Sequence, residues 1–224
     1  MKKIEIRQTA DGSNTLYLPD LDETYHSSNG AVQEAKHVFI EHGLKYVYGQ
    51  GGKEIRIFEM GFGTGLNALL TAQTSKRLNL PIAYIGIELH PVPDEIWQNM
   101  EYVQVTSEKE EYSKIMSAPW EKSVEIHPFF QLKKIEQDIL RFQPSEQVDL
   151  IYYDAFGPRA QSEMWDIPVL SKMYDLLKPG GIFITYCAQG QMKRNLKSLG
   201  FSLEALPGPP GKREMTRATK GSNQ

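Results

Sequence analysis

The stretch Glu59-Met60-Gly61-Phe62-Gly63-Thr64-Gly65-Leu66-Asn67 decides the fold of this chain. An apolar alternation at residues 55–58 precedes it, and an apolar run at residues 66–70 follows it. These flanks predict a strand, a glycine-rich turn and a helix. Because glycine has no side chain, a ligand can closely approach the backbone N–H groups of such a turn and the N-terminus of the helix.

The three glycines follow the spacing G-x-G-x-G, which differs from the G-x-G-x-x-G of dinucleotide sites. With the acid Glu59 in front, this spacing favours the amino-acid end of S-adenosyl-L-methionine over a pyrophosphate. Glu59 would pair with the amino group of this cofactor, while the amides of residues 61–65 and Asn67 would meet its carboxylate. The alternative is a tight turn that binds nothing, which three glycines in five residues disfavour.

A second acid lies at the end of the next predicted strand. Residues 81–88 form an apolar run that ends in Glu88, 23 residues after Gly65. A carboxylate at the end of the second strand of a βαβ unit typically accepts hydrogen bonds from ribose hydroxyls. We therefore expect Glu88 to bind the ribose of the cofactor, although a solvated glutamate at a strand end is a common alternative.

The remaining patterns predict an α/β fold in two parts. Residues 1–52 read as an N-terminal appendage: a hairpin at 4–9 and 14–18, then a helix capped by Ser28 or Asn29. From residue 53 to 224, strands and helices alternate, which predicts a Rossmann-like, mostly parallel, doubly wound sheet. Further strands are expected at 129–135, 148–153, 182–187, 201–206 and 215–219, and helices at 94–112, 169–177 and 192–199.

Composition narrows the class of protein. The chain has 224 residues, a single cysteine, Cys187, and no apolar run of about 18 residues that could span a membrane. Residues 1–5 carry charge but no apolar signal core, so we expect a cytoplasmic protein. The five histidines show no metal-ligand spacing with carboxylates, and we expect no metal site.

The charge is distributed unevenly. The net charge is −3, yet the residues from Gln189 onward include seven basic and two acidic side chains. A basic end on an acidic body can form a local phosphate-binding patch despite a low pI. A solvated helix face followed by a charged tail is the alternative, and charge alone does not decide between them.

The residue after the predicted strand at 148–153 is Asp154, in Tyr153-Asp154-Ala155-Phe156-Gly157-Pro158. This segment resembles the Asp/Asn-Pro-Pro-aromatic motif of amino-group methyltransferases. A carboxylate that accepts an N–H bond aims the lone pair of an amine at a methyl donor. We expect Asp154 to orient the amine and pass on its proton, with a helix cap as the alternative role. Phe156 and Trp165 are expected in a loop, where they could stack on a flipped base.

Four sequence blocks together resemble one family, the methyltransferase part of the bifunctional tRNA 5-methylaminomethyl-2-thiouridine biosynthesis enzyme and its stand-alone versions. The resemblance covers nearly the whole chain. The blocks are Asp11-Gly12-Ser13 with Tyr25-His26-Ser27 and Gly30-Ala31; Gly61 to Asn67; Tyr153 to Pro158 with Glu163-Met164-Trp165; and Gly208-Pro209-Pro210-Gly211-Lys212-Arg213-Glu214-Met215.

The resemblance implies a class I fold and methyl transfer from S-adenosyl-L-methionine to the aminomethyl nitrogen on a tRNA wobble uridine. It places Asp138 near the adenine and Asp154 in both the cofactor and acceptor sites. Phe156, Pro158, Trp165, Lys212 and Arg213 fall on the tRNA side. The bifunctional enzyme also carries an FAD-dependent oxidase domain, for which this chain has no second dinucleotide motif, so we expect a separate oxidase upstream.

Two other functions compete with this one. A small-molecule transferase such as a polyamine aminopropyltransferase has a similar sheet and an Asp-rich loop after the fourth strand. Its glycine loop usually carries an acid where Thr64 stands here. A non-catalytic RNA-binding module that retains the fold is the other alternative.

Overall fold

The fold is described from a computed structural model, which describes residues 4–100, 102 and 109–221. The first half contains β1 (Glu5–Gln8), β2 (Asn14–Leu18), β3 (Glu23–Thr24), α1 (Ala31–Ala35), the π-helix η1 (Lys36–Leu44), α2 (Lys45–Gly49), β4 (Ile55–Met60), α3 (Leu66–Leu78), β5 (Ile82–Glu88), α4 (Asp94–Trp97) and α5 (Lys109–Ser117). The second half contains β6 (Ser123–His127), β7 (Phe130–Glu136), β8 (Val148–Tyr153), the 3-10 helix η3 (Ser162–Trp165), α6 (Ile167–Leu176), β9 (Leu177–Thr185), α7 (Gly190–Ser198), β10 (Phe201–Pro207) and β11 (Glu214–Lys220).

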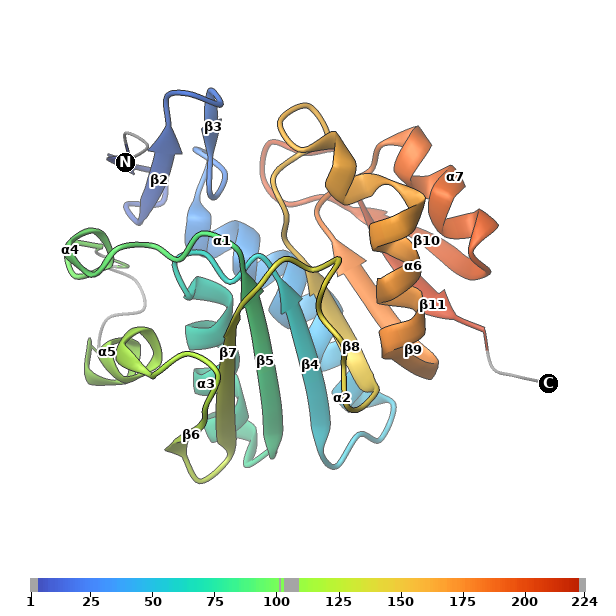
Figure 1. The fold of residues 1–224 in the computed structure, drawn as a ribbon, viewed down its shortest axis with the longest axis horizontal. Helices are drawn as coiled ribbons and strands as arrows, with labels where there is room; N and C mark the ends of the chain where they lie inside the picture. Colours follow the sequence, from blue (N-terminus) through green and yellow to red (C-terminus); the bar gives the residue numbers. More distant parts are fainter. Residues whose placement is uncertain (1–3, 101, 103–108, 222–224) are drawn as a thin grey trace.

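The main sheet has eight strands in the order β10-β11-β9-β8-β4-β5-β7-β6 (Figure 1). The five central strands β9, β8, β4, β5 and β7 pair in parallel, and the pairs β10–β11, β11–β9 and β6–β7 are antiparallel. The order reverses around β4, as in doubly wound sheets, where ligands bind beyond the carboxyl ends of the strands. The predicted Rossmann-like α/β class is confirmed.

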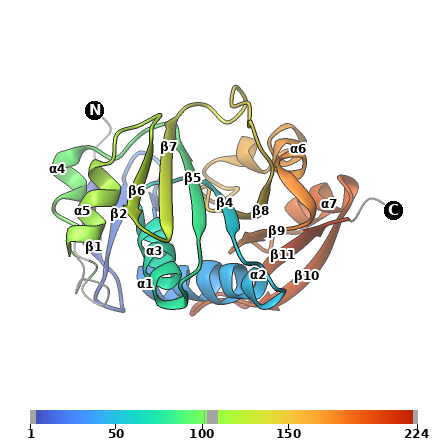
Figure 2. The same ribbon diagram turned by 90° about the horizontal axis from the view of Figure 1, so that it is seen from below.

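Helices cover both faces of this sheet. Figure 2 shows α1, α2 and α3 on one side and α6 and α7 on the other. Strand β8 serves both layers because its side chains alternate between faces: Leu150 and Tyr152 join one buried cluster, while Ile151 and Tyr153 join the other. Within the described part of the chain, every helix is too short or too polar to cross a membrane.

The N-terminal hairpin forms as predicted, but the helix after it is capped differently. α1 starts after Gly30, with no side-chain cap from Ser28 or Asn29. Instead, Asp11 in the hairpin turn accepts a hydrogen bond from the Gln33 backbone N–H at 3.0 Å. Gly30 has φ of 140°, and a Cβ there would lie 2.8 Å from Asp11 Oδ2. The contact with Asp11, which is distant in sequence and is not predicted by the residues around Gly30, therefore replaces the expected cap.

The helical segment 31–49 packs on the main sheet. Phe39 lies 5.0 Å, ring centroid to centroid, from Tyr152 in the middle of β8. Gly43 allows this approach, because a Cβ there would lie 3.2 Å from the Tyr152 ring. The hairpin thus adjoins a helix that shares the core of the sheet, and a division at residue 52 stays a prediction.

Two other predicted elements differ from the structure, and one strand was not predicted. The expected helix at 94–112 is described only as α4 and α5, with 101 and 103–108 outside the described residues. Strand β6 was missed, because its alternation is short and polar. Strand β9 begins at Leu177 rather than at 182, since the Pro179-Gly180-Gly181 segment continues the strand instead of forming a separate loop.

The close packing of β5 against the glycine-rich loop gives a stability prediction. A Cβ at Gly86 would overlap the buried Phe62 ring, whereas one at Gly49 has no neighbour within 4 Å. We expect Gly86→Ala to lower the free energy of unfolding by about 1–3 kcal/mol, the usual cost of overpacking. Gly49→Ala is the matched control and should be neutral or slightly stabilising. Urea denaturation followed by circular dichroism measures both, and equal stabilities would contradict the packing described here.

Candidate active site

A pocket of about 440 Å³ lies beyond the carboxyl ends of β4, β5 and β8. Its floor is the glycine-rich loop after β4, and its walls include segments after β5, β7 and β8. The N-terminal sheet closes one side through side chains such as Leu18, Tyr25 and His26. The pocket therefore sits at the position where open α/β sheets bind ligands.

The loop is shaped by its glycines and by hydrogen bonds to β5. Gly61 has φ of 86°, and a Cβ there would lie 2.9 Å from the Asp154 carbonyl oxygen. The N–H groups of Gly61 and Phe62 both donate to the Ile87 carbonyl oxygen, and the Gly63 N–H donates to Glu88 Oε2 at 3.0 Å. The loop is thereby held close against both neighbouring strands, with its upper surface in the pocket.

Thr64 anchors the far side of the loop. Its side chain accepts a hydrogen bond from the Tyr102 hydroxyl, and its carbonyl accepts one from the Tyr112 hydroxyl at 3.0 Å. Thr64 is 1% exposed and both tyrosines are buried. These bonds satisfy buried polar groups that would otherwise be costly.

The amide of Asn67 joins two acids at the base of the pocket. Its Nδ2 donates to Glu59 Oε1 at 2.9 Å and to Asp154 Oδ2 at 2.8 Å. Asn67 lies in the first turn of α3, and the acids lie at the ends of β4 and β8. Asn67 Oδ1 is buried without a hydrogen-bond partner among the described residues, whereas Glu59 also interacts with the Tyr84 hydroxyl.

Burial controls the ionisation of both acids. It raises the pKa of Glu59 well above its ordinary value, and the neighbouring carboxylates Asp154 and Glu88 act in the same direction. Burial also raises the pKa of Asp154 to about 7; Glu34 adds to this, while the Asn67 hydrogen bond and Lys212 oppose it. Because both carboxyls accept a hydrogen bond from the same Asn67 nitrogen and Glu59 is buried, the two cannot both ionise easily.

Two more predicted cofactor residues line the pocket. Glu88 accepts the Gly63 N–H on Oε2 and the N–H groups of Leu89 and His90 on Oε1, so its carboxylate is fixed at the pocket wall. Asp138, after β7, also lines the pocket and accepts the Leu140 N–H on Oδ1 at 2.8 Å.

The other end of the pocket is aromatic. Tyr25 meets Phe156 edge to face with ring centroids 5.0 Å apart, and both line the cavity. His26 lies beside them, and burial lowers the pKa of its imidazole to about 4, so the ring is neutral at pH 7. Its Nδ1 is buried without a partner among the described residues.

Trp165 corrects a sequence expectation. It was expected in a loop where it could stack on a base, but it lies at the end of η3 and is 3% exposed. Its indole N–H donates to the Phe156 carbonyl oxygen at 2.9 Å. Trp165 therefore supports the backbone of Phe156 from beneath and offers no free ring face to a ligand.

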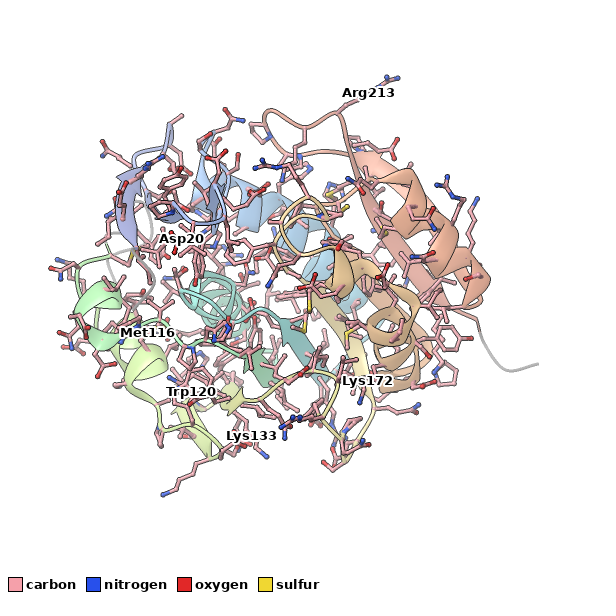
Figure 3. The ribbon with its side chains drawn as sticks, turned by 45° about the horizontal axis from the view of Figure 1, so that its top comes forward. Asp20, Met116, Trp120, Lys133, Lys172 and Arg213 are labelled. Atoms are coloured by element: carbon pink, nitrogen blue, oxygen red, sulfur yellow. The ribbon has the colours of Figure 1, made fainter. Side chains whose placement is uncertain are left out.

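The side chains of the neighbouring basic residues Lys212 and Arg213 point in different directions. Lys212 turns inward, where its Nζ lies 2.6 Å from Glu34 Oε1. Arg213 is exposed and points away from the body at the top of Figure 3. Of this pair, which the resemblance places on the tRNA side, Lys212 is bound by a buried acid on α1 and Arg213 extends into solvent.

The pocket collects most of the predicted cofactor residues. Those that line it are Gly61, Phe62, Gly63, Thr64, Asn67, Glu88, Asp138 and Asp154. Of the described residues predicted for the site, Glu59, Gly65, Pro158, Trp165, Lys212 and Arg213 lie outside its wall. Tyr25 and His26 form a wall of the pocket that was not predicted, although the Tyr25-His26-Ser27 block contributes to the family resemblance.

The fold and this site define a Rossmann-like protein with a glycine-loop pocket for a nucleoside cofactor. The family described as S-adenosyl-L-methionine-dependent methyltransferase matches residues 97–221. The chain belongs to this methyltransferase family, and S-adenosyl-L-methionine is its cofactor.

Comparison with individual proteins confirms the resemblance drawn from the four sequence blocks. The chain is 30% identical, in an alignment of 223 positions that covers 91% of its length, to the tRNA 5-methylaminomethyl-2-thiouridine biosynthesis bifunctional protein MnmC of Cupriavidus necator. It covers 32% of that protein, so it spans about a third of the length of such relatives. The crystal structure of MNMC2 from Aquifex aeolicus matches all of this chain and 72% of its own, with a TM-score of 0.81 at 21% identity.

A spermidine synthase from Thermotoga maritima shares the fold more distantly. It matches with a TM-score of 0.58 at 13% identity, over 100% of this chain and 71% of its own. At this identity the likeness concerns the fold alone.

The residues present fit the cofactor. The buried acceptor Asn67 Oδ1 belongs to a residue in the pocket wall and matches the hydrogen-bond donors of an ammonium group. Gly61 and Gly63 leave the loop surface without side chains. A carboxylate at the end of β5 suits a ribose.

The raised pKa of Asp154 predicts a pH-dependent stability difference. A carboxyl whose native pKa lies above its unfolded value binds more protons when folded, so stability falls as pH rises from about 4 to about 7. Asp154→Asn keeps the acceptor for Asn67 but cannot ionise. We expect the variant to gain stability relative to wild type across this window and to hold the gain above it. Urea denaturation at a series of pH values measures this, and a pH-independent difference would contradict the assignment.

Proposed function

We propose that this protein transfers a methyl group from S-adenosyl-L-methionine to the amine of 5-aminomethyluridine, or its 2-thio form, at the wobble position of tRNA. The observation that carries this proposal is the position of Asp154. Through the Asn67 amide it is joined to the base of the cofactor loop, while it lines the same pocket as Phe156 and Tyr25. One pocket thus holds a donor end and an acceptor end.

The donor end would be held by groups from three strands. Glu59 and Asn67 offer acceptors to the ammonium group, the loop amides meet the carboxylate, Glu88 meets the ribose, and Asp138 lies on the adenine side. Glu59 is buried and does not line the pocket, so it would act on the ammonium group through Asn67, to which it is hydrogen-bonded. An approaching ammonium group favours the ionised form of Glu59, since an opposite charge lowers the pKa of an acid.

When bound, S-adenosyl-L-methionine supplies an electrophilic methyl group whose carbon–sulfur bond breaks as the nitrogen–carbon bond forms. Asp154, as the carboxylate, accepts an N–H of the amine and so aims its lone pair at the methyl carbon. The same carboxylate then takes the proton that the nitrogen releases. A pKa of about 7 suits this exchange near neutral pH, where Asp154 populates both forms.

The acceptor end suits a planar base. Phe156 and Tyr25 present aromatic surface beside Asp154, and neutral His26 adds no positive charge that would repel a cationic amine. Base stacking on such rings contributes about 1–3 kcal/mol per base. Outside the pocket, exposed Arg213 is proposed to contact tRNA phosphate. The relatives' name supports a tRNA substrate. An FAD-dependent oxidase that acts upstream, implied by the sequence resemblance, stays part of the proposal.

The test is methylation of tRNA from a strain that lacks the gene, using donor labelled in the methyl group and mass analysis of the nucleosides. We expect label in 5-methylaminomethyluridine. Asp154→Asn should cut turnover by roughly 10²-fold or more, the scale of a lost base. Asp166→Asn, the same change at an exposed acid outside the pocket, is the matched control and should retain turnover.

Other outcomes would replace this function. Aminopropyl transfer to a polyamine from decarboxylated donor would favour the spermidine synthase relationship. Tight tRNA binding without methyl transfer would favour a binding module. Unchanged turnover in Asp154→Asn would leave that side chain with only a turn-forming role.

A further inference from the structure

Lys212 lies between two parts of the chain that are far apart in sequence. Its Nζ lies 2.6 Å from Glu34 Oε1 and 3.8 Å from the centroid of the Tyr186 ring. The Glu34 side chain is 10% exposed and the Lys212 side chain 34% exposed, so the carboxylate is shielded from water and the lysine is half-buried. An ammonium group shared between a carboxylate and an aromatic face is well stabilised in such surroundings.

Each partner of Lys212 is one hydrogen bond from a residue next to the pocket. Glu34 Oε2 accepts the backbone N–H of Ser27 at 2.9 Å, and Ser27 follows His26. The Tyr186 hydroxyl donates to the carbonyl oxygen of Ala155 at 2.8 Å, and Ala155 follows Asp154. Lys212 therefore connects the N-terminal wall of the acceptor end with the segment after β8.

The loop that carries Lys212 is docked on the N-terminal helical segment. The Pro207 carbonyl oxygen lies 2.9 Å from His37 Nε2. Gly211 has φ of 84°, and Asn29 fills the space that a Cβ there would need. Residues 207–212 thus have a fixed path against α1 and η1, whereas Arg213 leaves it toward solvent (Figure 3).

The charges around Asp154 come from several elements. Glu59 in β4 and Glu34 in α1 are negative when ionised, Lys212 is positive, and Tyr186 and Tyr84 are neutral hydroxyls nearby. Glu34 raises the pKa of Asp154 and Lys212 lowers it. Lys212 is the one cation among these neighbours, so its loss would leave a buried Glu34 charge uncompensated beside Asp154.

We propose that Lys212 is a positioning residue of the acceptor end, which ties its two walls together and offsets the charge of Glu34 beside Asp154, rather than a phosphate contact. This inference deepens the proposed function and rests on it for its catalytic consequence. Its structural part, the control of Asp154 by the Lys212–Glu34 pair, is independent of the substrate.

The test follows the Asp154 carboxyl by carbon-13 NMR during a pH titration of the full chain, with Asp154→Asn identifying the resonance. Lys212→Met should shift the Asp154 midpoint upward because a positive charge is lost. Glu34→Gln should shift it downward because a negative charge is lost. Lys212→Arg keeps the charge and should stay near wild type.

Arg213→Met removes a neighbouring cation and is the matched control. It should leave the midpoint of the Asp154 titration unchanged. Thermal melts show which variants fold.

Kinetics and tRNA binding separate the two proposed roles. Lys212→Met should lower kcat by about 10-fold to 10²-fold, the range expected from a small misplacement of reacting groups. It should also shift the acid limb of the kcat–pH profile to higher pH. Its tRNA affinity should keep the wild-type salt dependence. Arg213→Met should flatten that dependence by about one unit of slope, as for one lost phosphate contact.

Two results would overturn the inference. One is an Asp154 midpoint that does not move in either Lys212→Met or Glu34→Gln; the Glu34→Gln result decides if Lys212→Met fails to fold. The other is a salt slope that changes in Lys212→Met as it does in Arg213→Met. If wild type methylates no tRNA, the proposed function fails, while the NMR titration still decides the role of Lys212.

Discussion

The rest of the site depends on one interaction, the hydrogen bonds from the Asn67 amide to two carboxyls. Glu59 lies near the end of β4 and Asp154 follows β8, so the parallel pairing of these strands brings a buried acid and a half-buried acid together. Such a pair is stable only if donors reach it and if at least one member holds a proton. Asn67 supplies both N–H groups from the start of α3, which ties the glycine-rich turn to the acceptor end.

Segments at the two ends of the chain complete the pocket that this arrangement begins. The hairpin supplies Tyr25 and His26 as a wall, and Asp11 in its turn caps α1. The loop after β10 returns Lys212 to Glu34 on the same helix. The central sheet explains where a cofactor binds, whereas the terminal segments shape the space left for the acceptor. In the proposed function, selection of the acceptor therefore depends on the terminal segments as well as on the central sheet.

The sequence predicted those features that depend on local patterns. The apolar residues of 148–153 predicted β8 as a buried strand, and the glycine spacing predicted the turn between β4 and α3. Contacts between distant segments could not be predicted from local patterns. Nothing near Gly30 in the sequence indicates that Asp11 caps α1, and nothing near Lys212 indicates that it binds a buried acid on α1. Trp165 shows a third limit, because a 3-10 helix can bury a ring that a loop would expose.

The most direct measurement is calorimetric titration of S-adenosyl-L-methionine into wild type and Asn67→Ala at pH 7, with thermal melts to show that both are folded. If Asn67 organises the two acids around the donor, the variant should bind at least about 10-fold more weakly, a loss of about 1.4 kcal/mol. Equal affinity in the folded variant would contradict the account, because the cofactor would then be held without the interaction on which the site is built.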